Sequence, residues 1–193
     1  MSKQLDKLLV LSGFGLRLFI SGIHIFISLF RISFHSAFVP NLLNFTSTCA
    51  IAMIAAGFGI MFLAEHNILD LVIAGGFAIN LLTPVLSGII DARIYNVTRA
   101  SAHNPLSIFY LLIYLIGLLA FSSLPFLAWA FKLFRKSNLL AAFAIIGAFA
   151  ISVFSNMFFS FSALPIIRLI HFILSFGSNV ILAFVAFIEF NSD

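Results

Sequence analysis

Charged and apolar positions divide this chain into long blocks rather than alternating residue by residue. A helix that crosses the hydrocarbon core of a bilayer needs roughly 20 predominantly apolar residues. Charged side chains separate uncharged runs at 32–64, 71–90, 100–131, 137–167 and 169–188, and a further apolar run, 8–30, is interrupted only by Arg17. Each run can hold one crossing, so the pattern predicts six transmembrane helices, near 8–30, 43–64, 69–90, 106–131, 138–162 and 165–188.

Composition supports lipid as the main solvent. The 193 residues are 63% hydrophobic and only 8% charged, whereas a soluble domain carries about 25% charged residues. A membrane β-barrel would alternate with period two, and runs such as LLAAFAIIGAFAISVF do not. Helices also satisfy every backbone amide without water. We therefore expect an all-α, polytopic integral membrane protein.

The connections between the predicted helices are short, so residues 1–193 are expected to form a single transmembrane domain without a soluble part. Basic residues favour the cytoplasmic side, and we count them on the two sides. With the N-terminus inside, that side carries Lys3, Lys7, Lys132, Arg135 and Lys136, against Arg31, Arg93, Arg99 and, if it reaches the surface, Arg168. This excess predicts cytoplasmic N- and C-termini, in what we expect to be a bacterial inner membrane.

The net charge of +4 needs no nucleic acid, because basic residues that flank the helices can contact anionic lipid. Membrane lipid is the expected partner, together with other membrane subunits if the chain belongs to a larger complex. Trp129 stands just before Lys132 and is expected to anchor its helix at the membrane interface.

Small residues form three patches, at 49–59, 74–76 and 141–150. Such patches let helix backbones approach closely. They predict that the second, third and fifth helices form the tight centre of the bundle.

Arg17 lies inside the first predicted helix, in the stretch GLRLFISGIHIF. At ~1.5 Å per residue it would lie ~14 Å below the start of that helix. An arginine at mid-membrane costs about 2.5–3.5 kcal/mol on the insertion scale. One interpretation is that the helix starts late, residues 1–16 lie partly along the interface and Arg17 snorkels. The other is that Arg17 faces the bundle interior and pairs with carbonyls, a cofactor or an anionic substrate.

His24 in the first helix and His171 in the last fall at about the same depth, ~10 Å below the outer end. Histidines inside a membrane bundle are either hydrogen-bonded packing residues or functional groups. Two imidazoles that face each other at one level could ligate a b-type haem, with Arg31 and Arg168 near its propionates. This spacing is the basis of an alternative prediction, a haem-binding membrane electron carrier.

Polar residues beside two prolines favour transport. A proline frees the carbonyl four residues earlier, and broken, polar-lined helices often form substrate sites in transporters. Pro84 and Pro125 would each interrupt a helix. With Arg17, the expected substrate-binding residues are Asn80, Thr83, Ser122, Ser123 and Asn179. We expect a cavity between the third, fourth and sixth helices.

Several features are absent from the sequence. Every carboxylate lies near a predicted helix end or a terminus, and no lysine lies in a predicted span. No acidic residue is therefore expected inside the bundle, where a proton- or sodium-coupled carrier usually keeps one. Catalytic motifs are missing, and His66 and Asp70 in EHNILD lack a second ligand cluster of recognised spacing.

We therefore predict no catalytic residue, no metal site and, on the leading interpretation, no cofactor. That interpretation is a non-enzymatic membrane protein: a small transporter or channel, or an embedded subunit of a larger complex. The alternative is the b-haem carrier that uses His24 and His171.

Overall fold

The computed structural model describes residues 2–30, 32, 37–81, 122–159 and 165–191, and within these ranges the chain is helical apart from short turns. Shorter helical segments span Ile68–Leu81 and 122–135. The longer helices are α1 (Ser2–Leu29), α2 (Phe38–Glu65), α5 (Leu139–Phe159) and α6 (Pro165–Asn191). The all-α prediction is confirmed for these residues.

Three of these helices are long and apolar enough to cross a membrane: Gln4–Leu29 within α1, Phe38–Glu65 and Pro165–Asn191. The other described segments are apolar but shorter by this measure, including Ile68–Leu81 and Leu139–Ser155. Membrane insertion is thus supported through α1, α2 and α6, while six crossings remain a prediction. The first helix begins at Ser2, six residues before its predicted start at residue 8.

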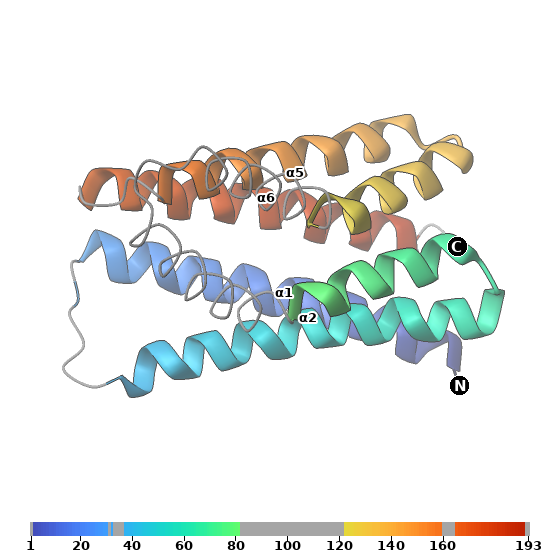
Figure 1. Cartoon of the computed structure of the whole chain (residues 1–193), viewed down its shortest axis with the longest axis horizontal. Coiled ribbons are helices and arrows are strands. Elements are labelled where there is room, and N and C mark those ends of the chain that lie inside the picture. The colour runs from blue at the N-terminus through green and yellow to red at the C-terminus, as the bar shows by residue number, and fades with distance from the viewer. Residues whose placement is uncertain (1, 31, 33–36, 82–121, 160–164, 192–193) are drawn as a thin grey trace, which may run out of the picture.

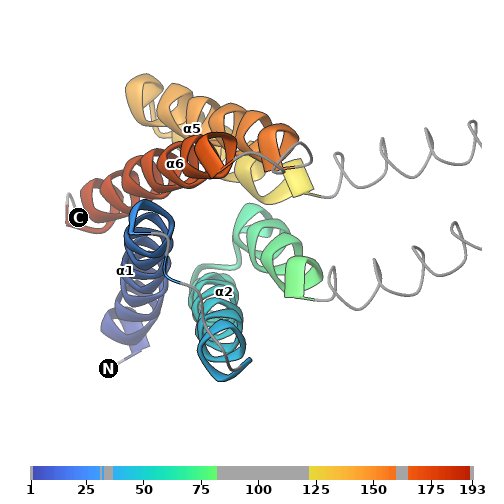
Figure 2. The same ribbon diagram turned by 90° about the vertical axis from the view of Figure 1, so that its left-hand side faces the viewer.

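The helices lie side by side and alternate in direction (Figure 1). α1 packs against both α2 and α6, and α5 packs against α6, as the end view also shows (Figure 2). The N- and C-termini lie at one end of the bundle (Figure 1), which we call the terminal end. The other end, where α1 stops and α2 and α6 begin, we call the opposite end.

Two tight turns at the terminal end set the antiparallel order. His66 adopts a left-handed conformation (φ 54°), and its N–H donates to the Phe62 carbonyl at 2.7 Å, which closes α2. The Asn67 side-chain oxygen then accepts the Leu69 N–H at 3.1 Å, and Asn138 likewise accepts the Ala141 N–H at 3.2 Å. Asparagine is a favoured N-cap residue, so each turn ends one helix and starts the next within a few residues.

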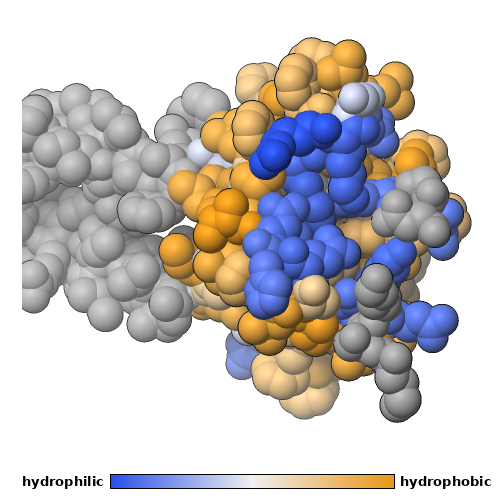
Figure 3. Space-filling model, turned by 90° about the vertical axis from the view of Figure 1, so that its right-hand side faces the viewer, coloured by the Kyte–Doolittle hydropathy of each residue, from blue (hydrophilic) through white to orange (hydrophobic). Residues whose placement is uncertain are grey.

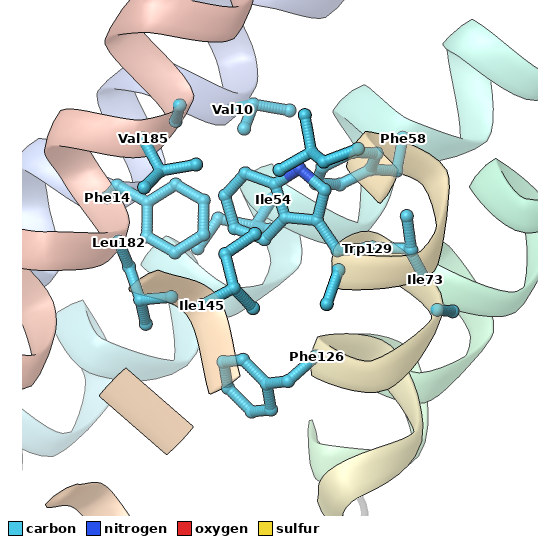
Figure 4. Packing of buried hydrophobic residues seen from close by; sticks show 14 of the residues in the cluster. Val10, Phe14, Ile54, Phe58, Ile73, Phe126, Trp129, Ile145, Leu182 and Val185 are labelled. Atoms are coloured by element: carbon cyan, nitrogen blue, oxygen red, sulfur yellow. The ribbon is translucent and has the colours of Figure 1, made fainter. Parts of the chain in front are cut away.

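Trp129 lies in the centre of the buried core (Figure 4). Its ring is 0% exposed, stacks on Phe14 with centroids 5.4 Å apart and meets Phe58 edge-on at 5.6 Å. Ile54 and Leu182 are buried in the same cluster. The prediction that Trp129 anchors its helix at the membrane interface is therefore wrong, because the indole faces the other helices.

Large apolar side chains cover the outside of the bundle. Leu140 is 80% exposed, Leu63 69% and Phe143 67%. Large contiguous apolar surfaces are rare on soluble monomers. The surface is therefore suited to lipid, in agreement with the three long apolar helices.

Glycines allow the closest helix contacts. A Cβ added at Gly57 of α2 would lie 2.5 Å from Val10 Cγ2 and 2.8 Å from the Asp6 carbonyl oxygen, and one at Gly76 would lie 2.7 Å from Pro125 Cδ. The patches at 49–59 and 74–76 thus do permit close approach, as predicted. The partners differ from the prediction: α2 meets α1, and the 68–81 segment meets the 122–135 segment. Gly147, in the third patch, has no such neighbour within 4 Å.

Alanine substitution should separate two glycines of α2. Gly57→Ala is expected to destabilise the bundle by about 1–3 kcal/mol, since the added methyl group collides with the backbone of α1. Gly59→Ala is the matched control, because its Cβ meets nothing within 4 Å. The control should be neutral or stabilising by up to about 1 kcal/mol, because alanine has the higher helix propensity. Denaturant titration in micelles, followed by circular dichroism, measures both, and equal effects would contradict the close α1–α2 contact.

Candidate functional site

A polar cavity of about 180 Å³ lies among α1, α2 and α6. The described residues that line it are Arg17, Ile20, Ser21, His24, Ser47, His171, Phe172, Ser175 and Asn179. Residues three, four and seven positions apart share one face of a helix. Arg17, Ile20, Ser21 and His24 therefore form a single stripe on α1. The α6 residues form a second stripe, and Ser47 completes the lining from α2.

The cavity reaches from the middle of the bundle toward the opposite end. Arg17 and Asn179 lie near the midpoints of α1 and α6. His24 is near the last turn of α1 and His171 is in the second turn of α6. At 1.5 Å per residue, Arg17 is roughly 18 Å from the end of α1 at Leu29.

Hydrogen bonds join α6 to α1 at the level of Arg17. The Asn179 amide nitrogen donates to Ser21 Oγ at 2.7 Å. Ser21 Oγ in turn donates to the Arg17 carbonyl oxygen at 2.9 Å. Both polar side chains are buried, so these bonds hold the stripe of α1 against that of α6.

Arg17 brings a positive charge to this cavity. Its side chain is half-buried, and no carboxylate within the described ranges pairs with it. Because α1 is one continuous helix from Ser2, the interpretation of a late-starting first helix is wrong. Arg17 lies well inside α1 and lines an interior cavity, as the second interpretation required.

His24 and His171 line the same cavity. The His24 ring stacks on Phe172 with centroids 5.1 Å apart and an angle of 11°. His171 Nδ1 lies 2.9 Å from both Ser155 Oγ and the Ser155 carbonyl oxygen, which ties α6 to α5. The structure thus brings the two histidines to one site, and at the same time gives His171 a packing role.

The haem alternative meets a size limit at this site. Pockets for drug-sized ligands measure about 300–1,000 Å³, and a porphyrin needs at least that much, whereas this cavity measures about 180 Å³. Arg168, predicted near a propionate, is exposed on α6, and Arg31 lies outside the described residues. In this arrangement the lining residues do not fit a haem.

The other predicted transport residues lie elsewhere. Asn80, Ser122 and Ser123 are partly buried on the 68–81 and 122–135 segments and are not among the described residues that line the cavity. Thr83 falls outside the described ranges. The cavity therefore lies between the first, second and sixth helices rather than the third, fourth and sixth, and of the predicted transport residues it unites Arg17 with Asn179.

A second polar site, the ion cluster of Asp70, Lys132 and Glu189, lies at the terminal end. Lys132 Nζ is 2.6 Å from Asp70 Oδ1 and 3.4 Å from Glu189 Oε1. The three residues are only 0%, 4% and 4% exposed, respectively. Trp129 Nε1 donates to Glu189 Oε2 at 2.6 Å, and the half-exposed Lys136 reaches Glu189 Oε1 at 3.7 Å.

The surface over this end is hydrophilic at its centre and hydrophobic around it (Figure 3). The ion cluster thus joins three helices, because its members come from the 68–81 segment, the 122–135 segment and α6. It places two carboxylates and one ammonium group inside the bundle, with a second ammonium group at the surface.

The ion cluster contradicts two sequence-based expectations. Acidic residues do lie inside the bundle, and Lys132, expected to flank its helix, is buried within the 122–135 segment. Each charged residue is within one turn of a helix end, as noted from the sequence, but alternating helix directions bring these ends together. That convergence is the signal that could have revealed the cluster.

Metal binding gains no support from the described residues. No group of three or more His, Cys, Asp or Glu side chains there could hold a metal ion. His66 is exposed in its turn, whereas Asp70 is buried against Lys132.

Comparison of the chain with protein-family models, with curated proteins and with solved structures finds no match. The cavity and the ion cluster are therefore the basis for an assignment of function.

Proposed function

We propose that this protein is a small multi-pass transporter that moves a polar solute across the cell membrane through six helices. The observation that carries the proposal is the polar cavity among α1, α2 and α6, with Arg17 near the middle of α1. A buried or half-buried charge is costly in a membrane bundle, and such residues commonly mark a solute pathway. The excess of lysine and arginine at the terminal end supports cytoplasmic termini.

The packing supports one closed end. On α6, Asn179 in the cavity and Glu189 in the ion cluster are separated by roughly 15 Å of helix. Leu182, Val185 and Ala186 lie between them and are fully buried. The apolar core and the ion cluster therefore close the terminal end, while the cavity extends toward the opposite end. Transport would require a second arrangement in which these two ends exchange roles, as in other two-state bundles.

Arg17→Gln is expected to reduce solute uptake by about tenfold to a hundredfold. A hydrogen bond to a charged group contributes about 1.5–3 kcal/mol, and 1.4 kcal/mol corresponds to a factor of ten. Uptake of radiolabelled small solutes into proteoliposomes is the measurement. Arg135→Gln is the matched control, since Arg135 is exposed at the end of the 122–135 segment. Uptake no faster than in protein-free liposomes would leave a structural subunit as the better interpretation.

The b-haem carrier remains the second candidate on one observation, that His24 and His171 line the same cavity. An absorption spectrum of the purified protein, expressed with adequate haem and recorded before and after dithionite, tests it. We expect no Soret band, because the cavity is too small for a porphyrin. A Soret band that is lost in both His24→Ala and His171→Ala would overturn the transport proposal in favour of electron transfer.

A further inference from the structure

We propose that the cavity among α1, α2 and α6 binds a small monocarboxylate, whose carboxylate group pairs with Arg17 and whose short apolar part packs against Ile20 and Phe172. The inference names a substrate class for the site on which the proposed transport function depends. Binding and transport can nevertheless be tested separately.

Charge is the first argument. Arg17 is the one permanently charged side chain among the described residues that line the cavity, since arginine stays protonated in proteins. A buried charge is costly unless an opposite charge pairs with it. No carboxylate of the described residues does so. A ligand with a single negative charge would neutralise Arg17, whereas a dianion would leave one negative charge unbalanced.

Hydrogen-bond geometry is the second argument. The planar guanidinium group presents parallel N–H donors that match a carboxylate in a bidentate pair. Ser47 and Ser175 also line the cavity, and in the described part of the chain their hydroxyl groups have no hydrogen-bond partner. Asn179 uses one amide proton on Ser21 and has a second to donate. The cavity thus offers a fork and additional neutral donors to an oxyanion.

Size and shape are the third argument. A volume of about 180 Å³ equals roughly six water molecules at ≈30 Å³ each. Ile20 and Phe172 give the lining an apolar wall, and the stacked His24 ring supports Phe172. An acid with a short hydrocarbon chain would satisfy both the polar and the apolar surface. Inorganic anions would leave the apolar wall unused.

Direct binding of [¹⁴C]propionate to the purified protein in detergent tests the proposal, with a scintillation proximity assay as the readout. We expect saturable binding that unlabelled acetate and butyrate displace. Propionamide, which has the same shape without the charge, and sodium phosphate should not compete. Equal displacement by phosphate or chloride would overturn the assignment of a carboxylate, and so would the absence of saturable binding.

Two variants connect the binding to the named residues. Arg17→Gln should weaken propionate binding by at least about tenfold, while Arg135→Gln should leave it unchanged. If Arg17→Gln does not fold, Ser47→Ala supplies the second test. It removes only a hydroxyl group and should weaken binding about twofold to tenfold. Unchanged binding in a folded Arg17→Gln protein, or in Ser47→Ala when Arg17→Gln does not fold, would place the ligand elsewhere and overturn the proposal.

The same preparations in proteoliposomes separate this proposal from the transport function. Propionate binding without uptake would overturn transport and leave the carboxylate site intact. Uptake of another solute without propionate binding would overturn the carboxylate proposal and leave transport intact.

Discussion

Replacement of Lys132 with methionine is expected to destabilise the folded bundle by about 3–5 kcal/mol, the cost of removing one partner from a buried ion pair. The ammonium group lies 2.6 Å from Asp70 Oδ1 and 3.4 Å from Glu189 Oε1. In the Lys132→Met protein these buried carboxylates would face each other without the cation between them. The midpoint of a denaturant titration in micelles, followed by Trp129 fluorescence, measures the change.

Lys136→Met is the matched control for Lys132→Met. Lys136 is 48% exposed and reaches Glu189 at 3.7 Å, and solvent-exposed ion pairs contribute about 0–1 kcal/mol. Restoring neutrality with Asp70→Asn in the Lys132→Met background should recover part of the lost stability. A Lys132→Met protein no less stable than Lys136→Met would show that the ion cluster does not hold the three helices together.

Trp129→Ala is the substitution with the next largest expected effect, a loss of about 3 kcal/mol. Truncation of a buried tryptophan costs about 3–5 kcal/mol. We expect the low end because the lost contacts are mainly dispersion contacts; helices in lipid lack a hydrophobic driving force toward one another. The substitution leaves a cavity beside Phe14 and Phe58 and removes the N–H that donates to Glu189.

Two controls separate the contributions of Trp129. Phe131→Ala, on the same helix but with a side chain that is 54% exposed, should change stability by no more than about 0.5 kcal/mol. Trp129→Phe keeps most of the ring packing and loses the bond to Glu189, so its effect should lie between the two. Circular dichroism is the readout, because Trp129 is the single tryptophan of the chain. Equal losses for Trp129→Ala and Phe131→Ala would contradict the central place of the indole in the core.

Several members of the cavity could be predicted from the sequence because membrane helices expose their exceptions. Arg17, His24 and His171 interrupt otherwise apolar runs, and each must find a polar environment inside the bundle or at its surface. Ser47 gave no such signal, since serine is common in membrane helices and can bond its own backbone. Its position in the cavity depends on how α2 packs beside α1.

The ion cluster could not be assembled from local patterns. Asp70 and Lys132 are 62 positions apart and Trp129 and Glu189 are 60 positions apart, so each pair depends on how two distant helices are rotated toward each other. Close contacts at glycine set such rotations: Gly57 admits α1, and Gly76 admits Pro125 of the 122–135 segment. The same rotation turns Trp129 into the core rather than toward lipid.

The sequence by itself determined that the described chain forms apolar helices, where charge interrupts them and which polar residues need an explanation. These properties follow from local composition, because a lipid solvent penalises every exposed charge and every unpaired amide. Tertiary structure alone decided that Arg17 and Asn179 line one cavity and that Asp70, Lys132 and Glu189 form one cluster. The physical reason is that side-chain partners on different helices depend on helix rotation and axial offset, and these are set by packing between surfaces that look alike in the sequence.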